Sequence, residues 1–341
     1  MINSLIIIGI VILIINFIIN YGAIVNICKK IREKVKIYDI LVNIIFICVI
    51  ALIGIIIGNK VINTKKDVIM EKEISEDQNK INNYQIEEQE YYKSVINVTY
   101  DQQKYNEPYI PEGYTYVEGE WNTGFVIQDE NENQYVWVPC TNKEIEGIAK
   151  LEKRNFSKSP YMSKDLCYDT EYKDFLASSL KYGGFYIARY EIGKSNEEIP
   201  IIKKDSEVWN NIDKEQAIEL IKKINNKSNI TIQLMNSYSY DTTFEWLIIT
   251  NREKLKYDVI KSDENGKRYT GNKSYNNIYD LYDTTYEMTT EVYYENTTIC
   301  RGTAGVYNDV MSGKIKDFDN RTALYSKKKD SLGFRTILYK E

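Results

Sequence analysis

The side chains that could carry chemistry in this chain are cysteines, carboxylates and tyrosines, because the sequence contains no histidine. Without an imidazole there is no histidine general base, no Ser-His-Asp or Cys-His nucleophile, and no histidine-built zinc or non-haem iron site. Five cysteines are present, at positions 28, 48, 140, 167 and 300. Histidine-dependent hydrolysis and histidine-bound metal catalysis are therefore excluded.

The cysteines are too few and too widely spaced to form a disulfide-rich scaffold. Cys28 and Cys48 lie in or beside strongly apolar stretches, which leaves Cys140, Cys167 and Cys300 for the polar remainder. Three thiols allow at most one bridge. We expect each of the three to be a buried structural thiol.

Two apolar stretches open the chain, at residues 4–25 and 40–58. Each is close to the ~20 residues that cross a bilayer as a helix. The first lacks the basic start and small-residue cleavage site of a signal peptide. The sequence therefore predicts a transmembrane helical hairpin over residues 1–59.

The short loop between these stretches, residues 28–36, carries five basic residues and one acid. By the positive-inside rule this loop is cytoplasmic, which places everything after Gly58 outside the cytoplasm. Lys60, Lys65 and Lys66 follow the second stretch and oppose this orientation. We expect a protein of the cell membrane with an extracytoplasmic C-terminal domain.

Residues 60–108 are rich in charged and amide side chains, with scattered isoleucine and tyrosine. This composition predicts a partly helical, solvated stalk that links the membrane hairpin to a globular domain. Ile74 and Ile81 lie seven residues apart, but no heptad pattern continues over three repeats. A dimeric coiled coil through the stalk is the alternative, and it would make the protein a homo-oligomer.

The remainder, residues 109–341, carries signals of both strands and helices. Apolar segments at 124–129 and 134–139, separated by the turn-forming residues 129–133, predict a hairpin, and alternation over 182–193 predicts another strand. Asp213 and Gln216 form a capping box before a helix with one apolar face. A second amphipathic helix is expected at 239–250, with Ser239 as its cap.

Three motifs close the chain: Asn277-Ile-Tyr-Asp-Leu-Tyr-Asp with the residues up to Glu291, then Cys300-Arg-Gly-Thr-Ala-Gly, then Leu332-Gly-Phe-Arg. In order and spacing they resemble the closing motifs of the formylglycine-generating enzyme (sulfatase-modifying factor) family. The resemblance implies an α+β domain of the C-type-lectin-like fold, with two helices and short antiparallel sheets, over residues 109–341.

The family's glycine-asparagine-valine-tryptophan-glutamate-tryptophan box aligns with residues 283–288, where only the acid Glu287 is identical. In the family part of this box supplies oxygens to a structural calcium. Asp280, Asp283 and Glu287 could replace those oxygens, since calcium takes six to eight oxygen ligands. A solvated acidic turn without metal is the other interpretation.

Enzymes of the family hold copper(I) through two cysteines that follow the arginine-glycine-glycine turn. Here the turn begins at Arg301, and residues 306–341 contain no cysteine. A lone thiolate is a poor copper site, because copper(I) selects several soft ligands. The resemblance therefore implies the scaffold without the family's oxidase activity.

Lectin-like relatives bind their ligands through loops that a rigid sheet carries. The corresponding segment here is 302–329. The residues expected to meet a ligand are Tyr282, Tyr286, Tyr307, Asn308 and Asp309, with Tyr293 and Tyr294 as further aromatic candidates. The residues expected to serve the scaffold are Arg301, Gly302, Gly333, Phe334 and Arg335. An arginine at a strand end commonly ties down a carboxylate.

The net charge of −5 argues against a nucleic-acid partner. We expect a membrane-anchored, externally displayed module that binds a protein or glycan ligand and lacks catalysis, a pseudoenzyme. The alternatives are a divergent modifying oxidoreductase and a structural or assembly subunit of a surface structure. The expected partners are the lipid bilayer and one external ligand, with calcium as the only candidate cofactor.

Overall fold

The computed structural model describes residues 9–21, 45–46, 48–49, 76–96, 106–153, 167–224, 229–251, 263–281, 286–293, 297–302, 322–324 and 332–341. The chain divides into two compact units, Met1–Ile74 and Ser75–Glu341, each considered by itself. In the first unit residues 9–21 are helical. None of the helices in the described ranges is both long and apolar enough to span a bilayer. The rest of the two predicted spans and the basic loop lie outside these ranges.

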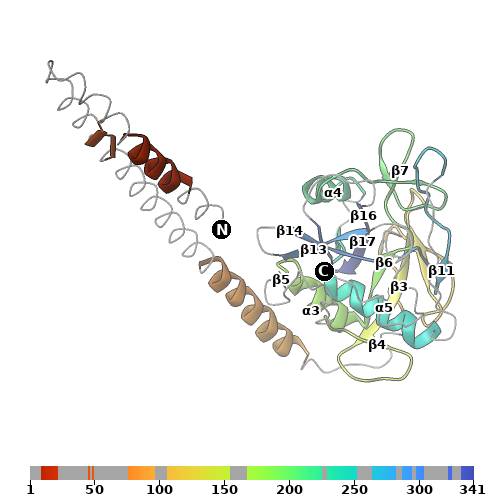
Figure 1. Ribbon diagram of the computed structural model, residues 1–341. Helices are drawn as coiled ribbons and strands as arrows, with labels where there is room; N and C mark the ends of the chain where they lie inside the picture. The colour runs from red at the N-terminus through yellow and green to blue at the C-terminus, as the bar shows by residue number, and fades with distance from the viewer. Residues whose placement is uncertain are drawn as a thin grey trace, which may run out of the picture. The chain divides into compact units, whose positions relative to one another are not determined.

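The second unit is a mixed α+β domain, as predicted, built around a seven-stranded sheet of the described residues (Figure 1). Its strand order is β1-β2-β3-β6-β17-β10, and the short β4 pairs in parallel with β3. All other neighbours in the sheet are antiparallel. The strands are β1 (Thr115–Glu118), β2 (Val126–Gln128), β3 (Gln134–Thr141), β4 (Ala149–Lys150), β6 (Gly184–Ala188), β10 (Ile230–Leu234) and β17 (Thr336–Lys340).

A second, five-stranded sheet is formed by four described strands from the C-terminal part of the chain and one earlier strand. Its strands are β5 (Cys167–Tyr168), β13 (Tyr286–Tyr293), β14 (Thr297–Arg301), β15 (Thr322–Leu324) and β16 (Leu332–Phe334). Here β16 runs parallel to β13, and β17 in the first sheet begins only two residues after β16 ends. The last closing motif and the residues after it therefore form two strands, and Arg335 lies at the point where the chain passes between the sheets.

Smaller sheets complete the domain. β7 (Gly193–Lys194) lies between β8 (Pro200–Ile201) and β9 (Glu207–Val208), and β11 (Ser274–Tyr275) pairs with β12 (Ile278–Tyr279). The predicted hairpin at 124–139 is confirmed as β2 and β3. The strand predicted at 182–193 begins later, at Gly184, because Gly183 with φ of 86° ends the preceding helix.

Three described helices accompany these sheets: α3 (Lys173–Tyr182), α4 (Lys214–Ile221) and α5 (Ser237–Asn251). The capping box of α4 is confirmed, since Asp213 accepts from the Gln216 amide at 2.9 Å and Gln216 accepts from the Asp213 amide at 3.2 Å. The sequence did not predict α3, whose N-cap Tyr172 makes no side-chain capping bond. Without a capping residue the start of this helix has no local signal.

The predicted cap of α5 was wrong. Asn236 is the capping residue, since its Oδ1 accepts from the Ser239 amide at 2.8 Å, and the Ser239 hydroxyl accepts from the Asn236 amide at 3.1 Å. Ser239 is therefore not the cap itself. It is the residue three positions later whose side chain bonds back to the amide of the cap. Burial of Asn236 makes this exchange valuable, because no water can replace it.

We expect Asn236→Ala to lower the free energy of unfolding by about 1–2 kcal/mol, since the first turn of α5 loses its capping acceptor. Urea unfolding followed by tryptophan fluorescence measures the change. Asn131→Ala, in an exposed turn, is the control and should change stability by less than about 0.5 kcal/mol. Equal losses in both variants would contradict the capping role.

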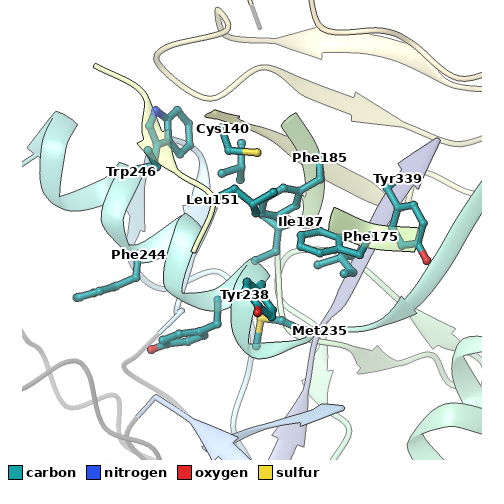
Figure 2. Packing of buried hydrophobic residues seen from close by; sticks show 14 of the residues in the cluster. Cys140, Leu151, Phe175, Phe185, Ile187, Met235, Tyr238, Phe244, Trp246 and Tyr339 are labelled. Atoms are coloured by element: carbon teal, nitrogen blue, oxygen red, sulfur yellow. The ribbon is translucent and has the colours of Figure 1, made fainter. Parts of the chain in front are cut away.

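The middle of the central sheet is covered on both faces because β3 and β6 are apolar at successive positions. On β3, Val136 and Val138 join the cluster beneath α3 and α5, while Tyr135 and Trp137 join the cluster that includes α4 and residues of β13 and β16. Figure 2 shows the first cluster, in which the rings of Phe175 and Phe185 meet at 4.9 Å. Strands buried on both faces form the rigid base for the loops around them.

Residues 76–95 form a helix that belongs to the second unit. Ile81 is 5% exposed, Tyr84 stacks on Tyr168 at 5.0 Å, and the Tyr92 hydroxyl donates to the Leu151 carbonyl at 2.7 Å. This part of the predicted stalk is helical as expected, but it is not solvated on the face that meets the domain. Ile81, proposed for a coiled coil, packs within its own chain.

Candidate functional site

The carboxylate of Asp280, a predicted calcium ligand, organises a loop. Asp280 has φ of 56° and is 2% exposed. It accepts from the amides of Gly271 at 2.7 Å, Asn272 at 3.1 Å and Lys273 at 2.9 Å. These bonds occupy both of its oxygens with backbone donors. Asp283, the second predicted ligand, lies outside the described residues.

Glu287, the third predicted calcium ligand, is fully buried against Arg335. The Arg335 Nε donates to Glu287 Oε1 at 2.9 Å, and Nη2 lies 2.7 Å from the same oxygen. Burial raises the pKa of Glu287, with Arg335 acting in the opposite direction. Glu191 adds to the increase. Among the residues that the structure describes, no three acidic, cysteine or histidine side chains converge as a metal site.

The aromatic residues expected to bind a ligand are divided between the core and the undescribed segments. Tyr286 is 7% exposed and packs in the cluster with α4, and Tyr293 is half-buried against Cys167 and Ile299. Neither presents an open ring. The other candidates, Tyr282, Tyr294, Tyr307, Asn308 and Asp309, lie outside the described residues.

The residues expected to serve the scaffold lie in the core. Arg301 is 1% exposed, forms an ion pair with Asp241, and has its guanidinium 4.5 Å from the centre of the Tyr240 ring. Gly302 has φ of 80°, and Gly333 and Phe334 lie in the buried strand β16. Arg301 thus ties β14 to α5, as Arg335 ties the C-terminal strands to β13.

The three thiols of the domain, Cys140, Cys167 and Cys300, are buried, as expected from the sequence. Burial raises the pKa of the Cys140 thiol. A buried protonated thiol is a poor nucleophile and a poor metal ligand.

An open polar groove of about 640 Å³ lies beside β7, which is labelled near the top of the domain in Figure 1. Its wall is formed by β7, the turn that follows, β9 and the segment around Tyr269. The charged residues that line it are Lys194, Glu198, Asp205, Glu207 and Lys267. Binding residues are commonly carried on such loops above a rigid sheet.

Close backbone packing positions the two sides of the groove. A Cβ on Gly193 would lie 2.5 Å from the Ser206 Cβ, so only glycine allows β7 to approach this residue. Thr270 joins the second side, because its amide donates to the Ser206 carbonyl at 3.0 Å and its hydroxyl donates to the Lys203 carbonyl at 2.6 Å. Residues sixty positions apart are thereby held in one wall.

Glu207 is the electrostatic centre of the groove. Its two oxygens lie 2.9 Å from Lys194 Nζ and 2.6 Å from Lys267 Nζ. The hydrogen bond from Lys267 and the contact with Lys194 lower the pKa of Glu207, and Glu207 in turn raises the pKa of Lys267. One carboxylate therefore bridges two ammonium groups from opposite sides of the groove wall.

Tyr269 gives the groove an aromatic surface, with 40% of the residue exposed. Carboxylates, ammonium groups and hydroxyls around one ring provide hydrogen-bond donors, acceptors and an apolar face together. That combination suits a polar ligand with some apolar surface.

The sequence alone did not indicate this groove. Glu207 and Lys267 are separated by 60 residues, and neither lies in a motif with known spacing. The local signals that were present are Gly193 after a strand and the Asp263 turn, which accepts from the Lys267 amide at 2.8 Å. These signals predict the two turns. They do not predict that the two turns lie side by side in the folded chain.

Comparison of the chain with protein-family models, with curated proteins and with solved structures finds no match. The groove, the buried ion pairs and the apolar N-terminal stretches are thus the features from which function is inferred.

Proposed function

We propose that this chain is a membrane-anchored module whose domain is displayed outside the cytoplasm and binds a polar ligand, a glycan or a protein segment, without catalysing a reaction. The observation that carries the proposal is the groove beside β7, in which Tyr269 is 40% exposed among paired charges. Aromatic rings at the centre of a polar site supply much of the affinity in many complexes.

The scaffold we propose is the C-type-lectin-like fold of the formylglycine-generating enzyme family. Glu287 and Arg335 occupy the positions that match the family's acidic box and its terminal glycine-phenylalanine-arginine motif, and the two side chains form a buried ion pair. This pairing supports the alignment of both motifs.

The membrane anchor is supported by the apolar stretches at 4–25 and 40–58 around a basic loop. The orientation is tested by adding protease to intact cells and following the fate of the domain. Cleavage of the domain in intact cells is expected. Protection until the cells are broken open would place the domain in the cytoplasm and overturn the proposal of external display.

We expect Tyr269→Ala to weaken ligand binding by about tenfold or more, because the ring is the exposed apolar surface of the groove. Full-length protein in detergent micelles is applied to arrays of glycans and of surface-protein peptides, and the affinity for each bound probe is then measured. Tyr116→Ala is the matched control, since Tyr116 is 52% exposed on β1 outside the groove.

Three results would contradict this function. Equal affinity of Tyr269→Ala and wild type would place binding elsewhere. Turnover of a bound peptide, lost on changing Cys300 or Glu287, would favour a divergent modifying enzyme. Binding of no probe, together with concentration-dependent oligomers that require residues 60–108, would favour an assembly subunit.

A further inference from the structure

A buried polar cluster lies where the 76–95 helix meets the domain. Lys153 Nζ is 2.5 Å from Glu88 Oε1 and 3.4 Å from Glu291 Oε1. Glu88 is 4% exposed, Glu291 is fully buried and Asp169 is 1% exposed. Of these groups only Glu88 comes from the helix, and the others belong to the domain.

The domain side of this cluster is held in place by further hydrogen bonds. The Thr290 hydroxyl donates to both oxygens of Asp169, at 2.9 and 3.0 Å, and Ser237 donates to Glu291 at 2.5 Å. Lys214 Nζ donates to the Thr290 carbonyl at 2.8 Å, and among the charged groups around Lys214 Asp169 interacts with it most strongly. The cluster is therefore a fixed site that the helix completes.

Several elements contribute charged or titratable groups around Glu88. They are Glu87, Tyr91 and Tyr92 on the same helix, Lys153 after β4, Asp169 after β5, Tyr172 and Lys173 at the start of α3, Tyr238 on α5 and Glu291 on β13, with Lys214 of α4 facing Asp169.

The four charged groups that the domain contributes to the centre of this cluster balance one another without the helix. Asp169 and Glu291 provide two negative charges, and Lys153 and Lys214 provide two positive charges. Docking brings Glu88 into this site as a third carboxylate. An uncompensated charge in a buried site is costly, and a carboxyl group avoids that cost by taking up a proton.

We propose that docking of the 76–95 helix is coupled to uptake of a proton by the buried carboxyl cluster, so that the helix is held more tightly at acidic than at alkaline pH. The helix would then act as a proton-sensitive latch on the binding domain. It stays docked at acidic pH and is released at alkaline pH.

The direction of the pH dependence follows from the acids of the cluster. Burial raises the pKa of Glu88 above its ordinary value of 4.5, with Lys153 opposing, and burial also raises the pKa of Asp169. A carboxyl group with a higher pKa in the docked state favours docking fully below its undocked pKa. That contribution is lost as the pH rises through the docked pKa.

The helix also makes contacts with the domain that do not involve Glu88. Gln85 donates to the Cys167 carbonyl at 2.8 Å, and the Tyr92 ring stacks with Tyr238 at 5.9 Å. These contacts belong to the helix surface, whereas the central sheet has its own core on both faces. Alkaline pH should therefore release the helix without unfolding the sheet.

The test is hydrogen exchange of full-length protein in detergent micelles, measured by mass spectrometry on peptides covering 76–95. Wild type is compared with Glu88→Gln, which cannot change its charge, and the ratio of their exchange rates removes the intrinsic effect of pH. We expect the ratio of the wild-type rate to the Glu88→Gln rate to rise with pH by up to about tenfold per pH unit, as release of one proton requires, once the pH exceeds the pKa of the undocked carboxyl group and until it passes the raised pKa of the docked cluster. Peptides of β3 should stay equally protected.

Two further variants sharpen the test. Asp169→Asn restores the charge balance from the domain side, so its exchange should also be independent of pH after the same correction. Glu90→Gln, an exposed acid on the same helix, should keep the wild-type profile. A flat ratio for wild type, or a helix released at every pH in Glu88→Gln, would overturn the proposal, because the ion pair to Lys153 would then hold the helix. Identical behaviour of Glu90→Gln and Glu88→Gln would overturn it as well.

Discussion

Replacing Arg335 with methionine is expected to remove about 3–5 kcal/mol of stability, which approaches the whole stability of many domains. Arg335 is fully buried between β16 and β17. Its guanidinium donates to Glu287, to the Ala188 carbonyl at 2.8 Å and to the Tyr279 carbonyl at 2.8 Å. Methionine fills similar volume but leaves a buried carboxylate and two carbonyls without their donor.

The measurement is urea unfolding of the full-length protein in micelles, followed by tryptophan fluorescence. Lys203→Met is the control, because Lys203 pairs with Glu132 at 2.9 Å on the surface and Glu132 is 71% exposed. That variant should change stability by less than about 0.5 kcal/mol. A similar small change in Arg335→Met would contradict the central role assigned to this residue.

A double variant separates the two parts of the loss. When both members of a buried ion pair are replaced by apolar side chains, the cost of an unpaired charge disappears. Arg335→Met with Glu287→Met should therefore recover part of the stability. Recovery should be incomplete, because the Ala188 and Tyr279 carbonyls still lack the guanidinium. Complete recovery would show that the carbonyl contacts contribute nothing.

Gly124→Ala is expected to lower stability by about 3 kcal/mol or more, from backbone strain and overlap together. Gly124 has φ of 105°, and a Cβ there would lie 2.1 Å from the Asn276 carbonyl oxygen. The Asn277 side chain also donates to the Gly124 carbonyl at 2.8 Å. The segment before β2 thus packs directly on the turn between β11 and β12, and an added methyl group must separate them.

Gly147→Ala is the matched control for this substitution. Gly147 has φ of 79°, but a Cβ there would meet no atom within 4 Å. It should lose only the about 1–2 kcal/mol that a left-handed backbone costs a residue with a Cβ. Thermal and urea unfolding of both variants give the difference that overlap alone causes. Equal losses would show that the contact with Asn276 relaxes freely.

Much of the local structure could be predicted because it depends on neighbouring residues. Alternating apolar residues with a turn between them predicted the β2–β3 hairpin, and Asp213 with Gln216 predicted the start of α4. The buried state of Cys140 and Cys300 also followed from the sequence. Where the local signal was absent, as at Tyr172 before α3, or ambiguous, as between Asn236 and Ser239, the prediction missed the helix or its cap.

By itself the sequence determined that histidine chemistry is absent, that apolar and polar segments are separated along the chain, and that the domain contains both strands and helices. Only the tertiary structure decided which charged groups meet. Glu207 reaches Lys267, Glu287 reaches Arg335 and Glu88 reaches Lys153 across large sequence separations. Hydrophobic periodicity specifies which face of an element is buried, but a charge acquires its partner only when distant elements pack together.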